Sequence, residues 1–150
     1  MHSKTYPYHS RCIFTKKLEY YQRSWEEKEK TVRSSEIFRN ATRSFTTSIV
    51  MNIRRRIYHL DEIIYEEGSE SSMLFLIKNG EIELSKKARF ESNKSCLNTP
   101  KSTERIVIAQ KTHSDCFGEV EMALEIPRDT RAKCVSSTLD VYYISKRRLY

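Results

Sequence analysis

One segment of the sequence, residues 116–128, reads CFGEVEMALEIPR. It contains Gly118, one of only three glycines in the 150 residues. Glycine is the residue that a chain needs where φ is positive or where the backbone approaches a ligand closely. Residues 120–126 are expected to form one short helix that Pro127 stops, because proline lacks the N–H that a helix interior requires. Any binding chemistry is therefore expected at this turn and helix.

The segments on either side of this turn are predicted to form short β-strands, because they are rich in β-branched and aromatic residues. One of them, residues 73–77, reads MLFLI and is apolar throughout, as in a strand that is buried on both faces. The predicted strands are residues 57–60, 63–65, 73–77, 82–84, 105–109 and 141–144.

Turn signals separate these strands. Asn79-Gly80 is a strong signal for a tight hairpin, so residues 82–84 are expected to return alongside residues 73–77. Residues 66–69, EEGS, break the chain after an earlier strand. Residues 86–104 are polar and contain Pro100, which indicates a long surface loop.

The N-terminal third is predicted to be helical. Residues 13–47 contain neither glycine nor proline, and a second helical piece is expected over residues 45–56, ending in three arginines. Cations at that position suit a helix C-terminus. Helices followed by many short, regularly spaced strands predict a mainly β fold, a sandwich or jelly roll preceded by N-terminal helices.

The positive charge of the chain is concentrated at its N-terminal end. Residues 1–56 carry 13 basic and 5 acidic side chains, a net charge of +8, whereas residues 57–150 carry a net charge of −1. A basic face of this kind can meet nucleic acid, anionic lipid or an acidic protein surface, and a solvated helix surface is the favoured interpretation. Nucleic acid is not the expected partner.

Several classes of protein are excluded by what the sequence lacks. It has no run of about 18 apolar residues, so no membrane span is expected. Its four cysteines form no CxxC pair, which argues against a metal site and for reduced thiols in the cytoplasm. Its four histidines are scattered and no catalytic motif is present, so we expect a protein that is not an enzyme and has no cofactor.

Three segments together resemble the cyclic nucleotide-binding domain of protein kinase A regulatory subunits, cyclic nucleotide-gated channels and bacterial catabolite activators. Residues 63–68, IIYEEG, resemble a strand and turn of that family, and residues 74–84, LFLIKNGEIEL, resemble its hairpin. Residues 117–128 resemble its phosphate-binding cassette. The resemblance covers about residues 45–150 and implies a jelly-roll β-roll of the cyclic nucleotide-binding type. Residues 1–44 would then be a basic helical extension.

The resemblance also implies a ligand, cAMP or cGMP, and a role for each residue of the cassette. Glu119 would accept a hydrogen bond from the ribose 2′-hydroxyl, Leu84 would contact the base, and Arg128 would grip the phosphate. Gly118 would let the backbone approach the phosphate, beside the start of the short helix. The remaining candidate ligand-binding residues are Phe117, Val120, Glu121, Thr130 and Arg131.

Two positions depart from the family pattern. Glu121 stands where the family has a small alanine, and a carboxylate about 4 Å from a phosphate would repel it by roughly 4 kcal/mol at an effective dielectric constant of about 20. Glu121 could point outward, or it could point inward, pair with an arginine and fill the pocket. The phosphate-binding arginine is Arg128 by spacing, with Arg131 as the alternative.

The family domains continue into C-terminal lid helices, and none is expected before Tyr150. Residues 45–150 are therefore interpreted either as part of a fragment or short isoform, or as a domain that lacks this lid. The sequence thus predicts a sensor or regulatory module for signalling that binds a cyclic nucleotide. The alternative is a degenerate jelly roll without ligand that acts as a protein-interaction scaffold, with the basic N-terminal helix as a possible contact for a protein partner.

Overall fold

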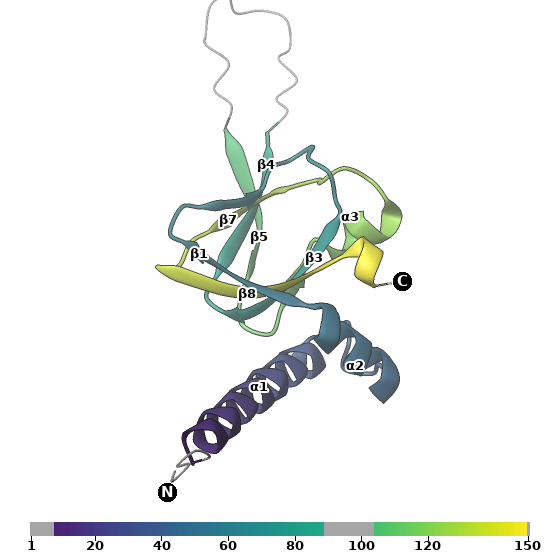
Figure 1. Cartoon of the computed structure of the whole chain (residues 1–150). Coiled ribbons are helices and arrows are strands. Elements are labelled where there is room, and N and C mark those ends of the chain that lie inside the picture. Colours follow the sequence, from purple (N-terminus) through teal and green to yellow (C-terminus); the bar gives the residue numbers. More distant parts are fainter. Residues whose placement is uncertain (1–7, 89–103, 150) are drawn as a thin grey trace, which may run out of the picture.

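The computed structural model describes residues 8–88 and 104–149. In chain order the elements are α1 (Tyr8–Ser34), α2 (Arg43–Asn52), β1 (Arg54–His59), β2 (Ile63–Tyr65), β3 (Met73–Asn79), β4 (Ile82–Lys87), β5 (Arg105–Lys111), β6 (Cys116–Phe117), α3 (Glu119–Leu124), β7 (Arg131–Cys134), β8 (Thr138–Ser145) and the 3-10 helix η1 (Lys146–Arg148). Figure 1 shows the strands wrapped into a roll, with α1 and α2 on one side of it.

Within the described residues, the strands form two antiparallel sheets of four. One sheet has the order β1-β8-β3-β6 and the other the order β2-β7-β4-β5. Strands that are neighbours in a sheet are mostly distant in sequence: Phe75 of β3 lies opposite Tyr143 of β8, and Leu84 of β4 lies opposite Ala132 of β7. This arrangement confirms the predicted mainly β jelly roll preceded by helices.

The apolar run of β3 separates two layers of core, because successive side chains of a strand point to opposite faces. Leu74 and Leu76 pack with Val32 of α1 and Ile49 of α2, between the helices and the first sheet. Phe75 and its neighbours pack between the two sheets. The members of this second layer are Tyr58, Phe75, Ile77, Ile82, Phe117, Ala132, Cys134, Leu139 and Val141. The prediction of a buried strand is confirmed for residues 74–77, whereas Met73 at the start of the strand is exposed.

The predicted hairpin at Asn79-Gly80 is wrong. β3 and β4 belong to different sheets, so this turn carries the chain from one sheet to the other. Gly80 has a φ of 101°, and a β-carbon there would lie 2.6 Å from the carbonyl oxygen of Thr138. Glycine is therefore needed because the turn packs against the backbone at the start of β8, a contact that sequence spacing does not reveal.

The predicted helix ends also need correction. The expected helix over residues 13–47 is divided, since α1 ends at Ser34 and Thr42 caps the start of α2 by accepting a hydrogen bond from the backbone N–H of Phe45. The second helix ends at Asn52, and the three arginines begin β1 instead. Pairing of β1 with β8 over six residue pairs overrides the local preference for helix there.

The remaining sequence expectations are met in part. The short helix of the cassette runs from Glu119 to Leu124 and ends with Glu125 in the left-handed region, before Pro127 is reached. Strands β6 and β7 were not predicted. Most of the expected loop, residues 89–103, lies outside the described residues.

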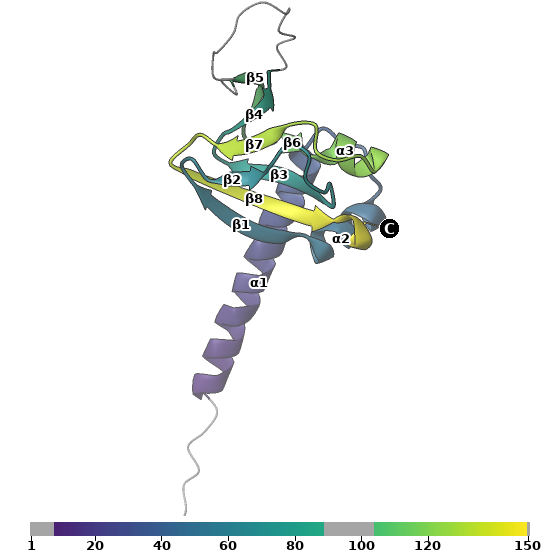
Figure 2. The same ribbon diagram turned by 90° about the horizontal axis from the view of Figure 1, so that it is seen from above.

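Figure 2 shows the N-terminal part of α1 extending well beyond the sheets. No helix in the described ranges is long and apolar enough to cross a membrane.

Candidate functional site

A cavity of about 280 Å3 opens beside α3 and is lined by residues of strands β2, β4, β5 and β6. Seven of the nine predicted ligand-binding residues line it, and the two arginines do not. The lining residues are Tyr65, Leu84, Lys111, Cys116, Phe117, Gly118, Glu119, Val120, Glu121, Ile126, Asp129 and Thr130. The fold therefore gathers Leu84 of β4 and Thr130, which precedes β7, around the segment that the sequence singled out.

Gly118 occupies the position that its sequence context predicted, a turn with positive φ. It caps the N-terminus of α3 with φ 78° and ψ 11°, in the left-handed region. A β-carbon at this position would lie 2.5 Å from Nη1 of Arg128. Glycine is required here for two independent reasons, the backbone conformation and the close approach of a guanidinium group.

Arg128 is buried against the turn at Gly118 and leaves only 3% of its surface exposed. Its Nη1 donates to the carbonyl oxygen of Gly118 at 2.7 Å, and its Nη2 donates to the carbonyl oxygen of Met73. The guanidinium carbon lies 4.3 Å from the centre of the Tyr65 ring. Both ends of the guanidinium fork are thus engaged within the protein, and the stacked ring shields its face.

Glu121 points inward and pairs with this arginine. Its Oε2 lies 3.7 Å from Nη1 of Arg128, and only 13% of the side chain is exposed. Of the two orientations left open by the sequence, the structure has the one in which the carboxylate faces the cavity and is paired with an arginine. The buried guanidinium is thereby balanced by a carboxylate of the same chain.

Arg131 lies apart from this cluster. It is the first residue of β7, and its Nε is 3.5 Å from Oε1 of Glu66, a residue that also pairs with Arg105 of β5. A quarter of the Arg131 side chain is exposed, and the residue does not line the cavity. Its predicted role in ligand binding has no support in this geometry and stays a prediction.

Sequence reasoning missed Tyr65 as a residue of the cavity. Burial raises the pKa of Tyr65 to about 12, in spite of a hydrogen bond with the side chain of Thr130 that lowers it. Its ring packs between Arg128 and the aromatic pair Phe75 and Phe117, whose rings stack at 4.9 Å. The one feature of the sequence that could have indicated Tyr65 is its position as an aromatic residue at the end of the predicted strand before Gly68.

The charged groups around the cavity are mainly acidic. Glu119, Glu121 and Asp129 line it, against the single base Lys111. Asp129 is paired with Lys86 at 2.5 Å, and Glu121 is paired with Arg128. Cys116 also lines the cavity, and burial raises the pKa of its thiol to about 11, so it is protonated at neutral pH.

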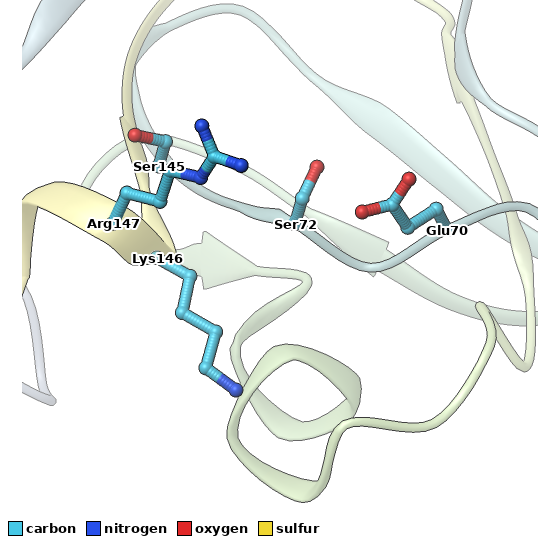
Figure 3. A pocket seen from close by; sticks show the side chains of 5 residues that line it. All are labelled: Glu70, Ser72, Ser145, Lys146 and Arg147. Atoms are coloured by element: carbon cyan, nitrogen blue, oxygen red, sulfur yellow. The ribbon is translucent and has the colours of Figure 1, made fainter.

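A larger cavity, of about 570 Å3, lies near the end of β8 and contains none of the predicted site residues. Figure 3 shows Arg147, Ser145, Ser72 and Glu70 spread along it, with Lys146 extended toward the loop of α3. Lys146 is already paired with Glu125, which lowers the pKa of that carboxyl. Within the described ranges, no group of three or more residues could hold a metal ion.

No family model matches the sequence, and no curated protein matches it. Solved structures do resemble it in fold. The regulatory domain of Toxoplasma gondii protein kinase A with cAMP is 18% identical, with a TM-score of 0.70 over 83% of this chain and 42% of that one. A putative cyclic nucleotide-binding protein from Ruegeria pomeroyi is 16% identical, with a TM-score of 0.67 over 80% and 47%.

A third similar structure is the regulatory subunit of a cAMP-independent protein kinase A from Trypanosoma cruzi bound to guanosine. It is 15% identical, with a TM-score of 0.66 over 83% of this chain and 38% of that one. This chain spans less than half the length of each of the three proteins. The resemblance inferred from the three sequence segments is confirmed at the level of architecture: this chain has the jelly-roll fold of the cyclic nucleotide-binding domain.

Proposed function

We propose that the chain is a non-catalytic sensor module whose 280 Å3 cavity binds a small ligand of the nucleoside and cyclic nucleotide class. The observation that carries this proposal is the convergence of Leu84, Glu119 and Thr130 on one cavity, although they come from distant parts of the sequence. The similar structures support the class, since the Toxoplasma gondii protein holds cAMP and the Trypanosoma cruzi protein holds guanosine.

The chemistry of the lining suits such a ligand. Small-molecule sites are concave and largely apolar, with a few polar groups that fix the orientation of the ligand. Leu84, Val120 and Ile126 offer apolar surface to a base, and the Glu119 carboxylate can accept hydrogen bonds from ribose hydroxyls. The proposal extends to a cytoplasmic location, where the free thiols of Cys116 and Cys134 would stay reduced.

The test is a thermal-shift titration of the whole chain with cAMP, cGMP, adenosine and guanosine. A ligand that binds only the folded state raises Tm in a saturable way. We expect such a rise with at least one of the four ligands, and a smaller rise for Glu119→Gln. Glu83→Gln, on β4 but outside the lining, is the matched control and should behave like the native chain. No rise with any of the four ligands would refute the binding function.

The pairing of Glu121 with Arg128 favours a second candidate, the degenerate jelly roll that serves as a protein-interaction scaffold. In that case no ligand raises the Tm of the native chain. Glu121→Ala either behaves in the same way or acquires a ligand-dependent rise in Tm, because the carboxylate that fills the pocket is gone. The exposed apolar side chains of α1, Phe14, Leu18 and Tyr21, then offer a contact surface for a protein partner. A pull-down comparing the native chain with a Phe14→Ser, Leu18→Ser variant would test this.

A further inference from the structure

We propose, on the basis of the binding function above, that the cavity selects an uncharged nucleoside over the corresponding 3′,5′-cyclic nucleotide. The reason is that a carboxylate of the chain itself, that of Glu121, already holds the place beside Arg128 that a phosphate would need. The ligand class thereby narrows from nucleotides in general to ribose-bearing molecules without a phosphate.

Two of the three guanidinium nitrogens of Arg128 already have partners, and the third, Nε, is buried without a hydrogen-bond partner among the described residues. An arginine grips a phosphate through two N–H donors in a fork, whereas here Nη1 donates to Gly118 and Nη2 donates to Met73. The side chain is 3% exposed and does not line the cavity. Nη1 and the carbonyl oxygen of Gly118 are 2.7 Å apart in a direct hydrogen bond, which leaves no room for a phosphate oxygen between them. A phosphate could reach Arg128 only if these contacts were broken.

The electrostatic surroundings oppose an anion as well. A phosphate in the cavity would lie among Glu119, Glu121 and Asp129, with Lys111 as the only base of the lining. Lys86 offsets Asp129 and Arg128 offsets Glu121, which leaves Glu119 and Lys111 without an ion-pair partner among the described contacts. The opposition to a phosphate therefore comes from the carboxylate of Glu121 beside Arg128 and not from the net charge of the lining. Repulsion between like charges is stronger at a partly buried site than in bulk water.

The same carboxylates suit the hydroxyl groups of a free ribose. Ionised carboxylates are hydrogen-bond acceptors only, and bonds from hydroxyl donors to them are among the stronger hydrogen bonds in proteins. A nucleoside offers free 2′- and 3′-hydroxyls, and the two acidic residues of α3, Glu119 and Glu121, can accept from them. In a 3′,5′-cyclic nucleotide the 3′-oxygen is esterified, so one donor is lost and a negative charge is added.

Isothermal titration calorimetry on the whole chain tests this inference with adenosine, guanosine, cAMP and cGMP. We expect each nucleoside to bind at least about tenfold more tightly than its cyclic nucleotide, a ratio that calorimetry resolves readily. Glu121→Gln removes the charge with little change of shape, so it should raise the affinity for cyclic nucleotide and lower the nucleoside preference. Glu83→Gln is the control that should leave the ratio unchanged.

A second arm uses 3′-deoxyadenosine, which lacks the hydroxyl that cyclisation blocks. It should bind the native chain more weakly than adenosine, and the difference should shrink in Glu121→Gln. Cyclic nucleotides that bind the native chain as tightly as nucleosides would overturn this inference and leave the binding function standing. No binding of any of these ligands to the native chain and to Glu121→Gln would overturn both.

Discussion

Gly118 and Arg128 form a single structural unit at the scale of the residue. The turn needs glycine because its φ is 78°, and the space beside its α-carbon is taken by the guanidinium group that donates to its carbonyl oxygen. The arginine in turn links the cassette to Met73 at the start of β3. The arginine that was predicted to bind phosphate therefore holds the turn at Gly118 against the sheet, and its role in phosphate binding stays a prediction.

A pair of glycine variants separates backbone strain from crowding. Gly118→Ala should lower the free energy of unfolding by about 3 kcal/mol, because a left-handed conformation is strained for alanine and the β-carbon displaces Arg128. Gly68→Ala should cost only about 1 kcal/mol, since Gly68 has a similar φ of 84° and nothing within 4 Å of the added carbon. Urea denaturation measures the free energy of unfolding of both variants. Equal losses of stability would show that the added β-carbon at Gly118 does not crowd Arg128.

Arg128→Lys should destabilise the fold although the charge is kept. A lysine ammonium cannot span both carbonyl oxygens in the planar geometry of a guanidinium, so one buried acceptor loses its partner, at a cost of about 2 kcal/mol. Arg131→Lys, at a more exposed ion pair, should cost less than about 1 kcal/mol. Thermal denaturation of the two variants compares their losses of stability. A smaller loss for Arg128→Lys than for Arg131→Lys would argue against the two hydrogen bonds of the Arg128 guanidinium as stabilising contacts.

Tyr65 should titrate later than an ordinary tyrosine. Burial raises the pKa of Tyr65 from 10.0 to about 12, so the folded state favours the neutral phenol. The resulting stabilisation is complete below pH 10 and is lost as pH rises toward 12. The pH titration is followed by ultraviolet absorbance of the phenolate in the native chain and in Tyr65→Phe. The variant should lack one ionisation, and this ionisation should be the one that the native chain shows near pH 12. If the ionisation that Tyr65→Phe lacks lies near pH 10 instead, the Tyr65 ring is exposed to solvent.

At the scale of the element, α1 is joined to the first sheet by a charged cluster as well as by apolar contact. Lys78 of β3 donates to Glu27 of α1 at 2.9 Å and lies 3.7 Å from Asp140 of β8. Arg55 of β1 donates two hydrogen bonds of 2.8 Å to the same Asp140. The cluster therefore connects a helix and three strands, and it orients α1 more than it stabilises the fold.

The link between Glu27 and Lys78 predicts a pH dependence. The hydrogen bond from Lys78 lowers the pKa of Glu27 below 4.5, so the carboxylate contributes stability above that pH and loses it as pH falls through the lowered pKa. Glu27→Gln should cost less than about 1 kcal/mol at pH 7, because the pair is exposed, and nothing at strongly acid pH. Urea denaturation at the two pH values measures the loss, and Glu26→Gln, a neighbour on α1 whose hydrogen-bond partner is Gln22 and not Lys78, is the control.

At the scale of the whole molecule, the helices and the roll share one layer of core. Val32 of α1 and Ile49 of α2 are fully buried against Leu74 and Leu76 of β3. The N-terminal residues thus contribute to the same apolar cluster as the sheet. A substitution in this layer should therefore destabilise both the helices and the sheets.

Val32→Ala should destabilise the whole chain by about 2 kcal/mol, since it removes two buried methyl groups. Leu18→Ala, on the same helix but with the side chain 58% exposed, should change stability by less than about 0.5 kcal/mol. Fluorescence of Trp25 on α1 and circular dichroism of the sheets should report one coincident transition. Separate transitions would show that α1 unfolds independently of the roll.

The sequence by itself determined those features that depend on a few neighbouring residues. The apolar run of β3, the positive φ of Gly68 and Gly118 and the short helix after Gly118 follow from local chain preferences, and they sufficed for the class of fold. Local preference failed at residues 54–56, where pairing with β8 imposes a strand on a predicted helix end.

Tertiary structure alone decided which strands are neighbours and how the site is charged. The turn at Gly80 crosses between sheets because it packs on the backbone of Thr138, far away in sequence. The inward turn of Glu121 and the burial of Arg128 depend on Met73 and Tyr65, which only the closed roll brings to the cassette. Contacts between residues distant in sequence form when the chain packs, and no local pattern of residues encodes them.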